Sequence, residues 1–272
     1  MKLKLKWKII FSIILLLIII YISVRFIGNI GLVVREYKIT NKKLESFYGL
    51  KIAHFSDLHY GMSVNEKKLN IIVNKINMTK PDIVVFTGDL IDKNIKITDE
   101  IFELLVSKLS KINSKYGKYY VSGNHDKNNK SYNTIMTESG FQNLNESYDV
   151  IYLNNSKMFI GGIDTNNTLN EKTIETLNLE NYDYKIMLSH YPDNADYLLK
   201  YNVDLILSGH SHNGQVRLPV IGKIITPNYA KKYYDPYYKI NDTLLYISGG
   251  IGNSTMNFRL FNKPSFNLYR LA

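Results

Sequence analysis

The chain has 272 residues, 45% of them hydrophobic, which suits one large domain or two small ones with a substantial core. It contains no cysteine, which excludes disulfides, cysteine-ligated zinc, iron–sulfur clusters and a thiol nucleophile. The formal net charge is +10, but the basic residues form no compact block typical of a nucleic-acid module. We therefore expect no nucleic-acid partner, and a basic surface that would also suit anionic lipid headgroups.

The N-terminus is predicted to be a membrane anchor. Residues 9–24 are apolar and uncharged, slightly short of a full membrane span, and the flanking Lys8 and Arg25 can reach the headgroups. No small-residue cleavage site follows, which favours an uncleaved helix over a signal peptide. Lysines alternate along the residues before the segment, so the positive-inside rule predicts a cytoplasmic N-terminus and an extracytoplasmic domain at the cell membrane. We divide the chain into a basic segment with its anchor, residues 1–31, and one domain, residues 32–272.

Beyond residue 31, short apolar runs alternate with amphipathic stretches. Five runs rich in β-forming residues are predicted as buried strands, at residues 51–55, 83–86, 119–121, 185–188 and 203–207. Helices are predicted over the amphipathic residues 65–77, 101–112 and, more briefly, 194–201. Further strands without intervening helices are predicted at residues 215–218, 243–248 and 267–271. This order predicts an α/β domain with a mixed sheet, or two stacked sheets, flanked by helices.

A potential metal ligand follows each of the five predicted strands. These strand-end donors are Asp57, Asp89, Asn124, His190 and His210. His59 and His212 add two imidazoles from the same loops. Ligands and substrates bind at the carboxyl ends of strands in open α/β sheets, so we expect these side chains to converge. Each motif alone is weak, but five of the six histidines fall in these motifs, and the conjunction predicts a metal site.

The motifs SDLH (56–59), TGDL (87–90), GNHD (123–126), SH (189–190) and GHSH (209–212) resemble, in order, the signature of the calcineurin-like metallophosphoesterases. The resemblance implies a four-layer α/β/β/α sandwich of two mixed sheets flanked by helices. It also implies two divalent metal ions, and oxygen donors mixed with imidazoles suit Mn²⁺, Fe or Zn²⁺. One ion would be held by Asp57, His59 and His212. The other would be held by Asn124, His190 and His210, with Asp89 bridging both.

The same resemblance assigns a mechanism. A hydroxide bridging the two metals would attack phosphorus, so no protein nucleophile is implied. His125 would stabilise or protonate the leaving group, and Asp126 would orient or charge its imidazole. Arg217 and Arg259 are candidates for binding a second phosphate of the substrate, and the alternative for each is a surface charge. His54, inside the first strand, is interpreted as a structural residue outside the site.

Residues 209–219 and 248–254, with Arg259, resemble a membrane-associated subgroup that includes YkuE- and YaeI-type phosphodiesterases and enzymes that cleave UDP-diacylglucosamine. Asn213 stands where that subgroup more often has glycine, which puts the loop shape beside the metals in doubt. The leading hypothesis is a phosphodiesterase or pyrophosphatase acting on a membrane- or envelope-related, possibly lipid-linked, phosphate ester. The alternatives are a soluble-nucleotide phosphodiesterase or nuclease, a metal-dependent transferase or sugar deacetylase, and a catalytically silent metal-binding scaffold. The sequence does not define the oligomeric state.

Overall fold

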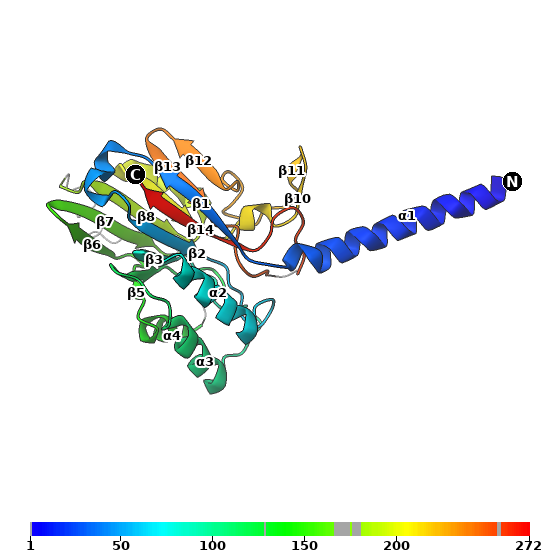
Figure 1. The fold of residues 1–272 in the computed structure, drawn as a ribbon, viewed down its shortest axis with the longest axis horizontal. Helices are drawn as coiled ribbons and strands as arrows, with labels where there is room; N and C mark the ends of the chain where they lie inside the picture. The colour runs from blue at the N-terminus through cyan, green and yellow to red at the C-terminus, as the bar shows by residue number, and fades with distance from the viewer. Residues whose placement is uncertain (1, 128, 166–174, 176–180, 255–256) are drawn as a thin grey trace.

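The computed structural model describes residues 2–127, 129–165, 175, 181–254 and 257–272. A long N-terminal helix, α1 (Lys2–Arg25), extends away from a layered domain (Figure 1). In the described part of the chain, the stretch Lys4–Asn29 is the one helical segment long and apolar enough to cross a membrane, judged by length and composition. Its apolar window is not buried against the domain, which agrees with a membrane segment.

Two six-stranded mixed sheets form the centre of the domain, in the orders β1-β14-β2-β3-β4-β5 and β12-β13-β9-β8-β7-β6. The first sheet consists of β1 (Val33–Ile39), β2 (Lys51–Phe55), β3 (Ile83–Phe86), β4 (Lys118–Tyr120), β5 (Gln142–Asn143) and β14 (Ser265–Leu271). The second consists of β6 (Tyr148–Leu153), β7 (Ser156–Ile163), β8 (Tyr184–Ser189), β9 (Leu205–Ser208), β12 (Tyr237–Ile240) and β13 (Thr243–Ile247). A separate hairpin pairs β10 (Arg217–Leu218) with β11 (Gly222–Lys223).

The direction of the strands brings their carboxyl ends together. In the first sheet β2, β3 and β4 are parallel, with β14 antiparallel to β2. In the second sheet β8 is parallel to β7 and to β9, and β13 is parallel to β9. The donors that follow β2, β3, β4, β8 and β9 therefore come from both sheets, rather than from one edge of a single sheet.

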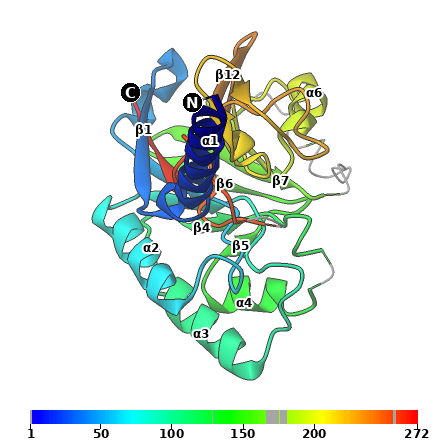
Figure 2. The same ribbon diagram turned by 90° about the vertical axis from the view of Figure 1, so that its right-hand side faces the viewer.

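Helices cover the outer faces of the sheets. On the first sheet lie α2 (Glu66–Met78), α3 (Asp99–Leu109) and α4 (Tyr132–Glu138), and α6 (Ala195–Leu198) lies on the second (Figure 2). Short 3-10 turns are η1 (Ile27–Asn29), η2 (Lys42–Phe47), η3 (Pro192–Asn194), η4 (Leu199–Tyr201) and η5 (His212–Gly214). The helix α2 begins where the side chain of Asn65 accepts a hydrogen bond from the backbone N–H of Lys68.

Successive side chains of a strand point to opposite faces of its sheet, so each sheet contributes side chains to two separate layers of the core. Phe55 and Phe86 pack with the side chains of the helices on the first sheet, whereas Ile52 and Val85 pack between the two sheets. On the outer side of the second sheet, Met187 packs with residues of α6. The predicted four-layer α/β/β/α arrangement is therefore confirmed, although α6 is the one α-helix of the outer layer in the described residues.

Candidate metal centre

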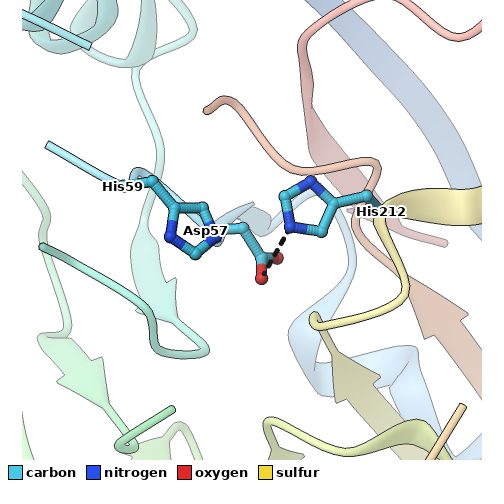
Figure 3. Close-up of side chains that lie close together, drawn as sticks. All are labelled: Asp57, His59 and His212. Carbon is cyan, nitrogen blue, oxygen red and sulfur yellow. Dashed lines mark ion pairs between the residues drawn. The ribbon is translucent and has the colours of Figure 1, made fainter. Parts of the chain in front are cut away.

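Asp57, His59 and His212 form the first group of donors. One ligand atom of each lies within 4.8 Å of the others, and Nε2 of His212 is 3.4 Å from Oδ1 of Asp57. Figure 3 shows the two imidazoles on opposite sides of the Asp57 carboxylate. All three side chains are buried. This group contains the residues that the sequence analysis assigned to one metal ion.

His190 and His210 form the centre of a second group with Asp89. Nδ1 of His190 lies 2.7 Å from the carbonyl oxygen of Thr87, and Nε2 of His210 lies 2.8 Å from that of Asn228. A carbonyl oxygen only accepts, so these nitrogens carry the protons and the opposite nitrogen of each ring has a free lone pair. Burial lowers the pKa of His210 to about 3, which keeps its ring neutral.

The two lone-pair nitrogens of this pair, Nε2 of His190 and Nδ1 of His210, are 3.1 Å apart. Oδ1 of Asn124, another acceptor, also lies 3.1 Å from Nε2 of His190. Acceptors at this distance repel each other unless a cation shares them. Nitrogen and oxygen ligands lie about 2.0–2.2 Å from a bound ion, so donors about 3 Å apart could share one ion. Imidazoles whose second nitrogen donates to a carbonyl are the usual arrangement for metal ligands.

Asp89 joins the two groups. Its Oδ2 lies 3.6 Å from Nε2 of His59 and 3.5 Å from Nε2 of His190. Its Oδ1 accepts a hydrogen bond of 2.8 Å from the backbone N–H of His125. Burial and the charge of Asp57 raise the pKa of Asp89 well above its ordinary value, and cations at both groups would favour its ionised form. The geometry therefore suits a bridging carboxylate.

Unsatisfied buried atoms also fit a metal at this place. Among the described residues, both ring nitrogens of His59 and Oδ2 of Asp92 are buried without a hydrogen-bond partner. Burial lowers the pKa of His59 well below its ordinary value, so the ring stays neutral and one of its nitrogens keeps a lone pair. Leaving such groups unpaired costs about 1–3 kcal/mol each. A divalent cation would satisfy one ring nitrogen of His59, and the mixture of imidazole and oxygen donors suits Mn²⁺, Fe or Zn²⁺.

Five of the donors occupy left-handed backbone, which non-glycine residues seldom adopt. They are Asp57, with φ 53°, His59, with 45°, Asp89, with 61°, His210, with 64°, and His212, with 47°. The hydrogen bonds of the flanking loops keep this conformation, as when the backbone N–H of Asp57 donates to the carbonyl of Gly88. Strained backbone of this kind concentrates at functional sites.

Close packing of loops around the carboxylates requires glycine at two positions. A Cβ on Gly123 would lie 2.1 Å from Oδ1 of Asp89, and one on Gly209 would lie 2.8 Å from Oδ2 of Asp57. Asn213 is buried with φ 51°, a conformation that asparagine tolerates better than most residues. The loop beside the site therefore keeps the backbone shape that glycine would give.

His125 lies at the edge of the centre, with Nε2 3.9 Å from Oδ2 of Asp89. The expectation that Asp126 orients this imidazole is wrong, because its carboxylate is occupied elsewhere. It accepts backbone N–H bonds from Asp89 at 2.6 Å, Leu90 at 3.0 Å and Gly123 at 2.9 Å. Burial nevertheless raises the pKa of Asp126 to about 7. Asp126 ties the loops after β3 and β4 together.

Asp92, rather than Asp126, is the carboxylate that lies beside the imidazole of His125. Its Oδ2 lies 3.7 Å from Nδ1 of His125 and 3.8 Å from Nδ1 of His59. The sequence analysis missed this residue. The one available signal was an acidic residue three positions after Asp89, in the same strand-end loop.

The two arginines do not fit the expected roles. Arg259 is fully buried, neither free for substrate nor a surface charge. It donates to the carbonyl oxygens of Gly249, Gly250 and Gly252, at 3.0, 3.0 and 2.7 Å, and Nη2 lies 3.3 Å from Nδ1 of His212. This guanidinium fixes the loop behind His212.

Arg217 is half-buried and spans two loops rather than facing the donors. Its Nη1 donates to the carbonyl of Asn213 at 2.8 Å, and its Nη2 contacts Oδ1 of Asp235 at 2.7 Å. His54 hydrogen-bonds Tyr269 and Thr87 through its two ring nitrogens, in agreement with its interpretation as a structural residue.

An apolar cavity of about 450 Å³ adjoins both groups of donors. His210 and His212 line one part of it, and Ile224, Ile225 and Phe258 line another. The cavity therefore connects the charged centre with the segment that follows the β10–β11 hairpin.

Residues 50–214 match the family of calcineurin-like phosphoesterases, and the chain belongs to this family. It is therefore a hydrolase that acts on phosphate esters. It is 35% identical over 230 residues to the metallophosphoesterase YkuE of Bacillus subtilis, covering 83% of this chain and 80% of that one. It is 27% identical over 259 residues to a zebrafish (Danio rerio) transmembrane protein with a metallophosphoesterase domain, covering 84% of this chain and 54% of that one. The name of this relative describes it as a transmembrane protein, and the segment Lys4–Asn29 of this chain is long and apolar enough to cross a membrane.

The fold is also similar to solved structures. The Plasmodium protein GAP50, described as the anchor in the inner membrane complex, aligns with a TM-score of 0.51 at 15% identity, over 81% of this chain and 80% of that one. This likeness concerns the fold alone.

Proposed function

We propose that the chain is a membrane-anchored, two-metal phosphodiesterase or pyrophosphatase that acts on a lipid-linked or envelope-related phosphate ester. The observation that carries the two-metal site is the position of Asp89, whose Oδ2 lies within 3.6 Å of a nitrogen in each donor group. Asp57, His59 and His212 would hold one ion, and Asn124, His190 and His210 the other. When bound, such ions neutralise the charge of the phosphate and activate water as the nucleophile.

The residues of the chain would orient the metal-binding imidazoles and supply a proton for the leaving group. The carbonyls of Thr87 and Asn228 fix the tautomers of His190 and His210, so that their lone pairs face the centre. The backbone N–H of Lys93 donates to Nδ1 of His125 at 3.2 Å, which leaves Nε2 to carry the proton of the neutral ring. His125 then holds this proton at the edge of the centre, where it can pass to the oxygen of the leaving group.

The apolar cavity supports a substrate with a hydrocarbon chain. His210 and His212 line it beside Ile225 and Phe258, so a phosphate at the donors would have apolar surface next to it. The anchor would keep the site near such substrates. We further propose that residues 1–31 form the anchor and residues 32–272 the catalytic domain, with the N-terminus in the cytoplasm and the domain outside, as the N-terminal lysines favour.

The first test is turnover of bis-p-nitrophenyl phosphate by the full chain in phosphatidylcholine nanodiscs, stripped with chelator and resupplied with Mn²⁺. We expect activity to return with metal and to be lost in Asp89→Asn. No turnover of any phosphodiester or pyrophosphate by a chain that binds two ions would overturn the proposal in favour of a silent scaffold.

The second test compares p-nitrophenyl methyl phosphate with p-nitrophenyl dodecyl phosphate, which differ only in the alkyl chain. We expect the dodecyl ester to have a kcat/KM about 10-fold higher or more, and Ile225→Ser to reduce this ratio. Tyr48→Ser, which replaces an exposed side chain outside the cavity lining, should keep the ratio. Equal values for both esters, with better turnover of nucleotides, would favour a soluble-nucleotide phosphodiesterase instead.

A further inference from the structure

The β10–β11 hairpin and the residues just after it expose a group of large aliphatic side chains. Val220 is fully exposed, and Ile221, Ile224 and Ile225 are 73%, 53% and 71% exposed. Four exposed large aliphatic residues thus fall within six positions, and a concentration of exposed apolar side chains marks an interaction site. We call residues 220–225 the apolar hairpin tip.

The end of α1 is fixed to residues 258–259. The backbone N–H of Arg259 donates to the carbonyl oxygen of Val24 at 2.9 Å. The ring of Phe258 lies against that of Tyr21, edge to face, with 6.2 Å between the centroids. Tyrosine is enriched where membrane helices leave the bilayer, so Tyr21 indicates the level of the interface on α1. The segment around Phe258 therefore lies at the membrane-facing side of the domain.

The same segment holds the base of the hairpin. The backbone N–H of Arg217 donates to the carbonyl of Leu260 at 3.0 Å, and the side-chain amide of Gln215 donates to the carbonyl of Phe258 at 2.7 Å. Through residues 258–260, the hairpin and α1 are thus fixed relative to each other. Figure 1 shows the hairpin at the side of the domain from which α1 leaves.

We propose that the apolar hairpin tip contacts the interfacial region of the bilayer that α1 enters. A second contact beside the helix would hold the domain in one orientation on the membrane. Ile224 and Ile225 also line the cavity next to His210, so this contact would turn the cavity toward the lipid surface. The exposed ring of Tyr229, shortly after the tip, suits the same interfacial position.

The absence of cysteine from the sequence allows a direct test. Single variants Val220→Cys and Ile221→Cys of the full chain would be labelled with the fluorophore NBD and placed in phosphatidylcholine–phosphatidylglycerol nanodiscs. Tyr48→Cys, also at an exposed position, serves as the matched control. We expect blue-shifted emission at positions 220 and 221, and about twofold or stronger quenching by lipids that carry a nitroxide on the acyl chain. Position 48 should show neither effect.

Two results would overturn the proposal. Emission at 220 and 221 equal to that at 48 would mean that the tip lies in water. A blue shift without quenching by the nitroxide lipids would mean that protein, such as a second copy of the chain, covers the tip. Since the readout needs neither metal nor turnover, it is independent of the proposed activity.

Discussion

Nε2 of His190 and Nδ1 of His210 lie 3.1 Å apart, and a main-chain carbonyl holds the other nitrogen of each ring. This arrangement suits a shared cation, because two imidazole nitrogens that both present lone pairs would otherwise repel each other. The carbonyls belong to Thr87 and Asn228, which lie far apart in the sequence. The fold therefore fixes the tautomers before any ion binds.

We predict that His190→Gln lowers the metal content from two ions to about one per chain, because it removes a lone pair from the second group only. The measurement is elemental analysis of the purified full chain after gel filtration. His54→Gln, a buried histidine outside both groups, is the control and should keep both ions. Two ions retained in His190→Gln would contradict the assignment.

His125→Ala should reduce kcat about 100- to 1000-fold for an ester with an alkyl leaving group, because the departing oxygen then lacks a proton donor. The loss should be much smaller with p-nitrophenolate, which leaves readily without a proton. The comparison of both esters separates proton transfer from metal binding, and metal content should stay the same. Equal losses on both esters would assign His125 to the metals instead.

Asp92→Asn should lower kcat about 10- to 100-fold, since Asp92 Oδ2 lies near both His125 and His59. The loss should again be greater for the alkyl ester than for the p-nitrophenyl ester. Unchanged kinetics on both esters would exclude a positioning role for Asp92.

Arg259→Met should destabilise the domain by about 3 kcal/mol, because the carbonyls of Gly249, Gly250 and Gly252 lose a buried donor. Arg217→Gln should cost less than about 1 kcal/mol, since both Arg217 and its partner Asp235 are partly open to solvent. Denaturant unfolding of both variants, followed by near-ultraviolet circular dichroism, measures the difference. A stable Arg259→Met variant with only a raised KM would restore the substrate-binding role that the structure argues against.

Acid should destabilise the fold partly through His54. Burial lowers the pKa of this histidine from 6.5 to about 3, so the unfolded chain binds a proton that the folded chain excludes. The free energy of unfolding should therefore fall as the pH drops below 6.5, by up to about 1.4 kcal/mol per pH unit from this group. His54→Gln, which keeps hydrogen-bonding groups without titrating, should have a shallower pH dependence. Parallel curves for the parent and the variant between pH 6.5 and pH 4 would contradict this.

The sequence predicted the inner strands except β7, and it missed the outer ones. The bounds of β2 and β3 agree with the prediction, because each is a short apolar run that ends in a polar loop. β1, β6 and β12 mix exposed polar positions with apolar ones, and β1 carries Arg35 and Glu36 at its centre. Such strands form because a neighbouring strand pairs with them, which local sequence does not reveal.

Some residues of the candidate site could likewise be predicted from the sequence, and others could not. The strand-end donors were predictable because each follows an apolar run in a recognisable motif. The positions of Asp92 and Arg259 depend on loops that meet only after folding, as when residues 249–252 surround the guanidinium. A charged residue in sequence gives no indication of whether such carbonyls will enclose it.

The place of β14 determines when the domain can be completed during synthesis. This strand is synthesised after all the other strands of both sheets, yet it lies between β1 and β2, the first strands of the domain. Its register runs from Val33 opposite Ser265 to Ile39 opposite Leu271. β1 therefore has no strand beside it until β14 has been synthesised. The newly made domain must remain open through nearly all of its translation, and a chain cut short before Ser265 would never close its first sheet.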